Sequence, residues 1–243
     1  WNVALLARAF VFFAYPTTIS GDQIWIAGFE QILPGMQVDY GWWQTSFFNT
    51  LFGWFGWAQF DAGATIVDGF TGATPMALAF EGGWDRVTEV YSSSQMFWGT
   101  IPGSIGETSK PLIILGALVL LITKIGSWRI MLSGLVGAVI MSMLFNLWGA
   151  TPFMTVPWQE QFVMGSFWFA IVFMATDPVT ASGTNFGKLV YGFLIGMIGM
   201  IIRIINPAYP EGWMLAILFL NTFAPLIDHY IVESNMKKRL KSA

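Results

Sequence analysis

Residues 128–148 read WRIMLSGLVGAVIMSMLFNLW, an apolar run of 21 residues whose single charge, Arg129, stands at its start. A helix needs about 20 consecutive apolar residues to cross the hydrocarbon core of a bilayer. Gly134 and Gly137 leave small faces that allow two membrane helices to approach closely. The run therefore predicts a transmembrane helix, and the chain around it is predicted to be an integral membrane protein.

Apolar segments of similar composition lie on both sides of this run. Five membrane helices are predicted between residues 111 and 232, at about 111–123, 128–148, 161–175, 189–205 and 213–232. A further apolar segment, residues 3–19, is broken by Pro16 and is just long enough to cross a bilayer. The fold class that follows is an all-α, polytopic helical bundle.

The composition excludes several classes of protein. Of the 243 residues, 55% are hydrophobic and 10% are charged, against roughly 25% charged residues in soluble domains. The chain has no cysteine, which excludes disulfides, iron–sulfur ligation and thiol catalysis. Its one histidine, His229, cannot form a histidine metal site alone. The net charge is −3 and no basic patch indicates a nucleic-acid partner.

The positive charges predict how the chain is oriented. If residues 111–232 cross the bilayer five times, Lys124, Arg129 and Lys188 lie on the same side as the basic tail, residues 233–243. These loops and the tail hold seven of the eleven Lys and Arg residues. Because positive loops stay in the cytoplasm, the tail is predicted to be cytoplasmic and residues 20–110 to form an external, periplasmic loop region.

That external region carries the most distinctive motif, Asp68-Gly69-Phe70-Thr71-Gly72-Ala73-Thr74-Pro75. Its small residues leave the Thr74 hydroxyl open to approach, and successive backbone N–H groups in such a turn can hold a phosphate. The alternative is a Thr/Gly turn that caps a helix beginning at Pro75. Around the motif, residues 21–68 are expected to form interfacial loops and short helices, and residues 81–110 a polar loop.

Three charged side chains are expected at membrane depth. Arg8 lies inside the apolar segment 3–19, so it should face protein, water or an anion, unless its side chain reaches to the membrane surface. Asp177 and Asp228 lie near helix ends and are candidates for cation coordination. The alternatives are a cap or turn before Pro178 for Asp177, and pairing with the basic tail for Asp228. His229 is expected at the interface.

Four motifs occur in an order that resembles a known family. They are the stretch ending in Thr74, Thr176-Asp177-Pro178-Val179-Thr180-Ala181-Ser182, Asn206-Pro207-Ala208-Tyr209-Pro210-Glu211-Gly212 and Ala224-Pro225-Leu226-Ile227-Asp228-His229. Together they are similar to the B-type subunits of the sodium-translocating NADH:quinone oxidoreductases. The D-type subunits of the Rnf complexes share the first two motifs, whereas the third motif and the basic tail favour the quinone reductases.

The resemblance implies a membrane flavoprotein. FMN would be joined through its phosphate to Thr74, within a motif completed by Asp68, Thr71, Gly72 and Ala73. A non-covalent riboflavin would lie near Asn2, and Arg8 would be one of the residues that bind the cofactors.

The resemblance also implies a place in a respiratory chain. Electrons would enter from another flavoprotein outside the membrane and leave to ubiquinone, coupled to sodium export. The chain would be one of six subunits in a complex of the bacterial inner membrane. Its fold would be two inverted five-helix repeats. This chain would hold the second repeat and, at residues 1–19, the last helix of an absent first half.

Other classes remain open on the residues alone. Inverted repeats and polar breaks within a membrane also suit a passive channel or a solute transporter, and a purely structural membrane protein would have the same composition. A D-type Rnf protein, which transfers electrons between ferredoxin and NAD, is the nearest redox alternative. Only the redox proteins would give a yellow, fluorescent band on a denaturing gel.

Overall fold

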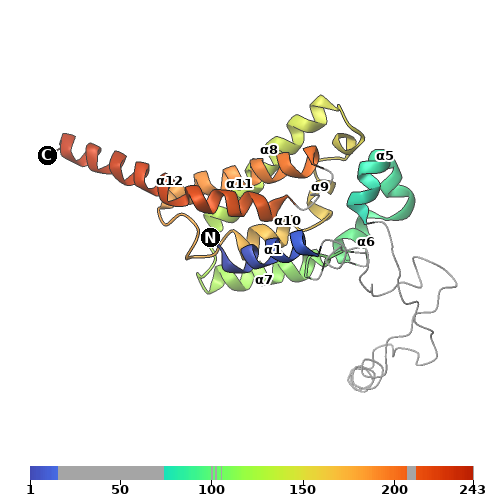
Figure 1. Ribbon diagram of the computed structural model, residues 1–243, viewed down its shortest axis with the longest axis horizontal. Coiled ribbons are helices and arrows are strands. Elements are labelled where there is room, and N and C mark those ends of the chain that lie inside the picture. Colours follow the sequence, from blue (N-terminus) through green and yellow to red (C-terminus); the bar gives the residue numbers. More distant parts are fainter. Residues whose placement is uncertain (16–73, 100, 102, 105, 207–211, 243) are drawn as a thin grey trace, which may run out of the picture.

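The computed structural model describes residues 1–15, 74–206 and 212–242, except residues 100, 102 and 105. Within these residues the regular elements are all helices, so the predicted all-α class is confirmed (Figure 1). Three helices are long and apolar enough to cross a membrane: α8 (Trp128–Trp148), α11 (Asn185–Ile205) and α12 (Trp213–Ser242). They match three of the five predicted spans.

Glycines allow α8 and α11 to pack directly against each other. A methyl group on Gly137 would collide with the carbonyl oxygen of Phe193, and one on Gly196 with the carbonyl oxygen of Gly134. With no side chain at these positions, the two backbones come into contact, as small-residue faces do in membranes. α12 packs on the other side of α11, and α1 (Val3–Ala14) lies beside α12.

The other two predicted spans differ from expectation. Residues 110–122 do form a helix, α7 (Lys110–Ile122), but its 13 residues rise only about 20 Å, less than the ~30 Å hydrocarbon core. The single helix predicted over 161–175 is wrong. That segment is α9 (Glu160–Val163), α10 (Phe167–Phe169) and a π-helical turn, η3 (Ala170–Met174). The break falls at Gly165, whose φ of +70° is incompatible with an α-helix.

The polar loop predicted over 81–110 is also wrong in its first half. Helix α5 (Pro75–Val90) and helix α6 (Ser93–Trp98) occupy it. Helix α5 is kinked at Gly83, where φ is +73°, and packs against the 3₁₀ turn η2 (Pro152–Thr155). Rings of Phe80 and Phe153 stack there with centroids 4.2 Å apart. Packing thus stabilises a helix whose charges and paired glycines are typical of a loop.

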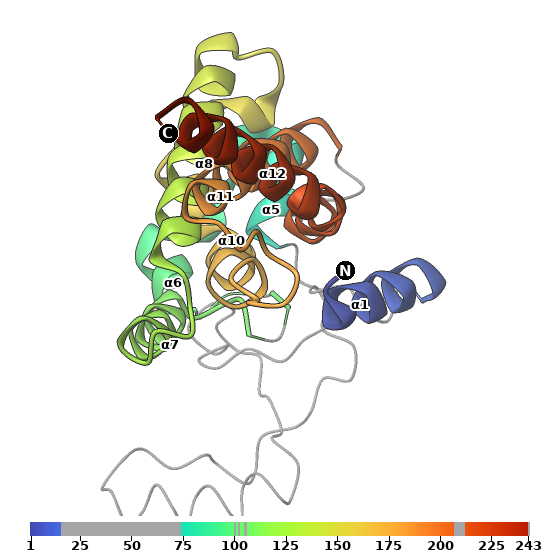
Figure 2. The same cartoon turned by 90° about the vertical axis from the view of Figure 1, so that its left-hand side faces the viewer.

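The bundle has two distinct ends. Hydrogen bonds join Arg129 at the start of α8 to Asn185 at the start of α11, and the loop before α11 to Asp228 of α12, so these parts of the three helices lie at one end of the bundle. At the opposite end Ser93 of α6 donates to Glu160 of α9. Figure 1 shows the same arrangement, with the C-terminus at the left and α5, α6 and α9 at the right. Figure 2 views the bundle from the end where α12 projects.

Candidate functional site

Thr74 is the residue immediately before α5. Its φ and ψ of −65° and 153° are extended, and its Oγ1 accepts a hydrogen bond from the Ala77 N–H at 3.2 Å. Pro75 follows as the first helical residue, so Thr74 caps a helix that begins at Pro75, as the alternative interpretation of the motif has it. Thr74 is still part-exposed, and a helix N-terminus favours a negative group such as a phosphate. Capping and phosphate attachment are therefore compatible.

The rest of the predicted flavin motif lies outside the described residues. This holds for Asp68, Thr71, Gly72 and Ala73. Their roles, and the presence of FMN at Thr74, stay predictions. The chemistry at Thr74 agrees with them, because a phosphate ester formed at Oγ1 would lie at the positive end of the α5 dipole.

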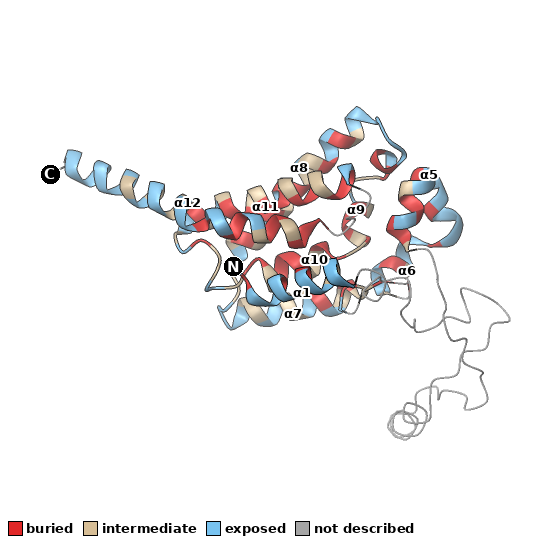
Figure 3. Ribbon diagram, in the orientation of Figure 1, coloured by how far each residue is buried: buried red, intermediate tan, exposed pale blue. Residues whose placement is uncertain are grey.

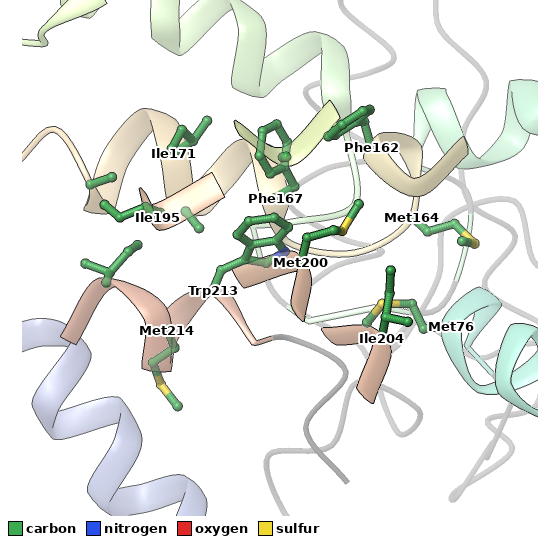
Figure 4. Close-up of a cluster of buried hydrophobic side chains, with 14 of the residues drawn as sticks. Met76, Phe162, Met164, Phe167, Ile171, Ile195, Met200, Ile204, Trp213 and Met214 are labelled. Atoms are coloured by element: carbon green, nitrogen blue, oxygen red, sulfur yellow. The ribbon is translucent and has the colours of Figure 1, made fainter. Parts of the chain in front are cut away.

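A buried arginine holds the first turn of α5. Arg203, in the last turn of α11, is fully buried, and its Nη2 lies 2.9 Å from the Met76 Sδ. Met76 stands two residues after Thr74, and Figure 4 shows it beside Met164 and Ile204 in the packed cluster. The guanidinium also donates to the carbonyl oxygens of Gln161 and Met164, at 2.8 Å each. Arg203 therefore connects the start of α5 to the broken segment.

A second buried cation sits at the same break. Lys110 Nζ donates to the carbonyl oxygens of Gly165 at 3.1 Å and Glu107 at 2.7 Å. The Glu107 carboxylate, also buried, accepts from the Ser104 N–H at 2.8 Å. A break in a buried helix leaves backbone carbonyls without their helical partners, and these need other hydrogen-bond donors. Here Lys110 of α7 donates to the Gly165 carbonyl, and Arg203 of α11 donates to those of Gln161 and Met164, so cations from two other helices satisfy the break.

The sequence does not predict that Lys110 and Arg203 lie together at one buried polar site. From the sequence, Lys110 is expected in a loop and Arg203 near a helix end. The available signal was Arg203 itself, because a charge within an apolar run of 21 residues is costly and marks a polar partner. Neither the partner nor the break at Gly165 follows from the sequence.

The predicted riboflavin residues lie at α1. Asn2 is buried and caps this helix, its Oδ1 accepting from the Leu5 N–H at 3.2 Å. Beside it the Trp1 indole N–H donates to Thr222 Oγ1 of α12 at 2.8 Å. Arg8 follows in the same helix and is part-exposed. In the structure Asn2 therefore acts as the cap of α1. Its role in binding riboflavin stays a prediction.

Asp177 forms a turn. Its Oδ2 accepts the Thr180 hydroxyl at 2.7 Å and its Oδ1 accepts the Val179 N–H at 3.3 Å. This agrees with the alternative to a cation site for Asp177, a turn residue before Pro178.

Asp228 has more partners. It accepts the hydroxyls of Ser182 and Thr184 at 2.6 Å each, and the N–H groups of Gly183 and Thr184 at 2.7 and 3.1 Å. These partners lie at residues 182–184, and not in the basic tail, which was the alternative to a cation site for Asp228. In the described part of the chain no three carboxylates or histidines gather as a metal site. A sodium role for either aspartate stays a prediction.

Comparisons with known proteins identify the family. Residues 1–237 match the model of the NQR2, RnfD, RnfE family. Among curated relatives, proteins named as the B-type subunit of Na(+)-translocating NADH-quinone reductase are 46% identical over 99% of this chain in Chromohalobacter salexigens and 45% over 98% in Ectopseudomonas mendocina. The one from Stutzerimonas stutzeri is 44% identical over 98%. The chain spans about half the length of these relatives. It belongs to the NQR2, RnfD, RnfE family.

Proposed function

We propose that this chain carries electrons through covalently bound FMN in a sodium-translocating NADH–quinone reductase. The observation that carries the proposal is the identity of 44–46%, over nearly the whole chain, to proteins named as the B-type subunit of that enzyme. The motif at residues 206–212 and the basic tail favour this enzyme over the D-type proteins of Rnf complexes. A channel or a purely structural membrane protein would need no flavin at Thr74.

Thr74 is the acceptor of the FMN phosphate in this proposal. It lies part-exposed at the positive end of α5, where the helix dipole favours a negative group such as a phosphate. Electrons would arrive there from another flavoprotein of the complex. They would continue to a riboflavin near Asn2 and Arg8, and then to ubiquinone.

The proposed orientation places Thr74 outside the cytoplasm. The arrangement of the bundle supports it, because α5 lies at the end opposite the basic tail (Figure 1). Lys124, Arg129 and Lys188, which the charge count groups with the tail, lie in or beside the turns at the tail end. In a bacterial inner membrane the tail would be cytoplasmic and α5 periplasmic.

Neither Asp177 nor Asp228 has to be a sodium ligand for this function. A carboxylate offers about four lone-pair sites, and Asp228 already accepts four hydrogen bonds. A sodium ion would have to displace one of those donors. Whether Asp177 or Asp228 lies on the sodium path is therefore a separate prediction, which needs its own measurement.

The experiment that tests the function is detection of the covalent flavin. The full chain, produced together with the other proteins of its complex, should give a band that fluoresces after denaturation. Mass spectrometry of the peptide holding residues 68–85 should show the mass of FMN less one water on Thr74. A peptide of unmodified mass, from protein whose assembly is complete, would contradict the proposal and favour a membrane protein without flavin.

A further inference from the structure

Helix α12 is longer than the membrane core requires. It runs for 30 residues from Trp213 to Ser242, which at 1.5 Å per residue is about 45 Å. The hydrocarbon core of a bilayer is about 30 Å thick, and about 40–45 Å with both headgroup layers. Residues 234–241 are exposed, and this end of α12 extends past the other helices (Figures 1 and 3). We call residues 233–242 the terminal segment.

An apolar stripe runs along this end of α12. Val232, Met236 and Leu240 are 47%, 58% and 76% exposed, and their spacing of four residues puts them on one side of the helix. Exposed apolar residues in a row need a partner, because water around them is unfavourable. No described helix of this chain covers them.

Cations occupy the rest of the circumference. Lys237, Lys238, Arg239 and Lys241 are all exposed, and the one acid in the terminal segment, Glu233, pairs with Lys237 at 2.7 Å. Three consecutive cations, 237 to 239, spread over about 200° of a helix that turns about 100° per residue. Charge spread in this way suits a surrounding anionic layer better than one flat protein surface.

We propose that the terminal segment binds anionic phospholipid headgroups, with Val232, Met236 and Leu240 reaching into the acyl boundary beneath them. Four basic residues directly after a membrane span attract anionic lipid, by about a fivefold gain in affinity for each cation. Amphipathic helices with this division of apolar and basic residues lie in the interface. The inference uses only α12, so it is independent of the proposed electron transfer and of which leaflet holds the tail.

The test uses the absence of cysteine from the chain. A fluorophore is attached at Met236→Cys in the full chain, reconstituted in phosphatidylcholine bilayers that contain phosphatidylglycerol. Nitroxide-labelled phosphatidylglycerol should quench it more strongly than nitroxide-labelled phosphatidylcholine. Raising the salt concentration should remove the difference, because screening weakens headgroup attraction. The same fluorophore at Leu147→Cys, at the opposite end of the bundle and 85% exposed, should show no preference between the two lipids.

A charge-removal variant decides the cause. Lys237→Gln, Lys238→Gln and Lys241→Gln together should lower the preference for phosphatidylglycerol by about a hundredfold, at fivefold per cation. These side chains are exposed, so the variant should elute like the parent protein. Equal quenching by both lipids in the parent chain would overturn the proposal. So would a label that neither lipid quenches in the assembled complex, which would mean that a partner protein covers the stripe.

Discussion

The Thr184 hydroxyl donates to Asp228 Oδ1 across 2.6 Å and so joins the N-terminus of α11 to the middle of α12. Thr184 is itself the cap of α11, its Oγ1 accepting from the Gly187 N–H at 3.1 Å. The Thr184 hydroxyl therefore caps α11 and also donates a hydrogen bond to a carboxylate of α12. The negative charge of Asp228 lies at the positive end of α11, where the helix dipole stabilises it. The pair fixes the register between two membrane helices.

Asp228→Asn should weaken this connection. An amide has one acceptor oxygen and an NH₂ group that would face the donors from the 182–184 turn, so at least one of them loses its partner. We expect the free energy of unfolding to fall by about 1–3 kcal/mol, measured by denaturant unfolding in detergent. Asp177→Asn, which disturbs a local turn of two bonds, should lower it by less.

Sodium titration of turnover separates this structural role from a transport role. If Asp228 acts only between helices, the assembled complex with Asp228→Asn should need the same sodium concentration for half-maximal turnover as the parent. A raised sodium requirement with unchanged stability would instead place the carboxylate in the ion path, since losing the charge weakens attraction for a hard cation.

Arg203→Met should detach the start of α5 from the membrane bundle. The substitution keeps an apolar body but leaves the carbonyls of Gln161 and Met164 without their shared donor, at about 1–3 kcal/mol for each unsatisfied group. Arg203→Lys keeps the charge without the forked geometry, so its stability should lie between those of the parent and Arg203→Met. Limited proteolysis near residue 75 should follow the same order.

The control for this prediction is Arg86→Gln. Arg86 is exposed on α5 and pairs with Glu89 within the same helix, an interaction worth about 0.3–0.5 kcal/mol. The Arg86→Gln variant should therefore leave the proteolysis pattern near residue 75 unchanged. Equal sensitivity in Arg86→Gln and Arg203→Met would mean that α5 is held by something other than the Arg203 contact.

The sequence predicts α8, α11 and most of α12 because each is one apolar run long enough to cross a bilayer. It does not predict the break at Gly165, because the neighbouring residues are apolar enough to continue the helix. The cations that satisfy the carbonyls at this break come from α7 and α11, at a distance in sequence. Likewise the charges and Gly82-Gly83 predict a loop where α5 forms, whereas packing on Phe153 stabilises the helix. The sequence motif predicts Thr74 as the flavin acceptor, and the structure adds that Thr74 lies at a helix N-terminus.

Thr74→Ala should remove the fluorescent band, because no hydroxyl remains to form the phosphate ester. It also loses the cap on α5, at about 1 kcal/mol. Thr74→Ser keeps both the hydroxyl and the cap, so it should retain fluorescence and stability; it is the matched control. Gel fluorescence per mole of chain measures the first effect, and unfolding the second. Covalent flavin persisting in Thr74→Ala would move the attachment to Thr71.

The last prediction concerns the side of the membrane on which α5 lies. Single cysteines at Ser94, exposed on α6, and at Ser242, the last residue of α12, report the two ends of the bundle. Ser94 is preferable to Ser93, whose hydroxyl bonds to Glu160 at 3.0 Å. A membrane-impermeant thiol reagent should label Ser94→Cys in cells with a permeable outer membrane and spare Ser242→Cys. Opening the inner membrane should then label both, which controls for reactivity.

The reason for this expectation is the distribution of charge. Seven of the eleven Lys and Arg residues fall in the tail or beside turns at its end of the bundle, and moving each across the membrane during insertion is unfavourable. An external α5 has a chemical consequence: a flavin on Thr74 must be attached and reduced outside the cytoplasm. Labelling of Ser242→Cys alone in intact cells would invert the bundle, and electrons would then have to enter from the cytoplasmic side.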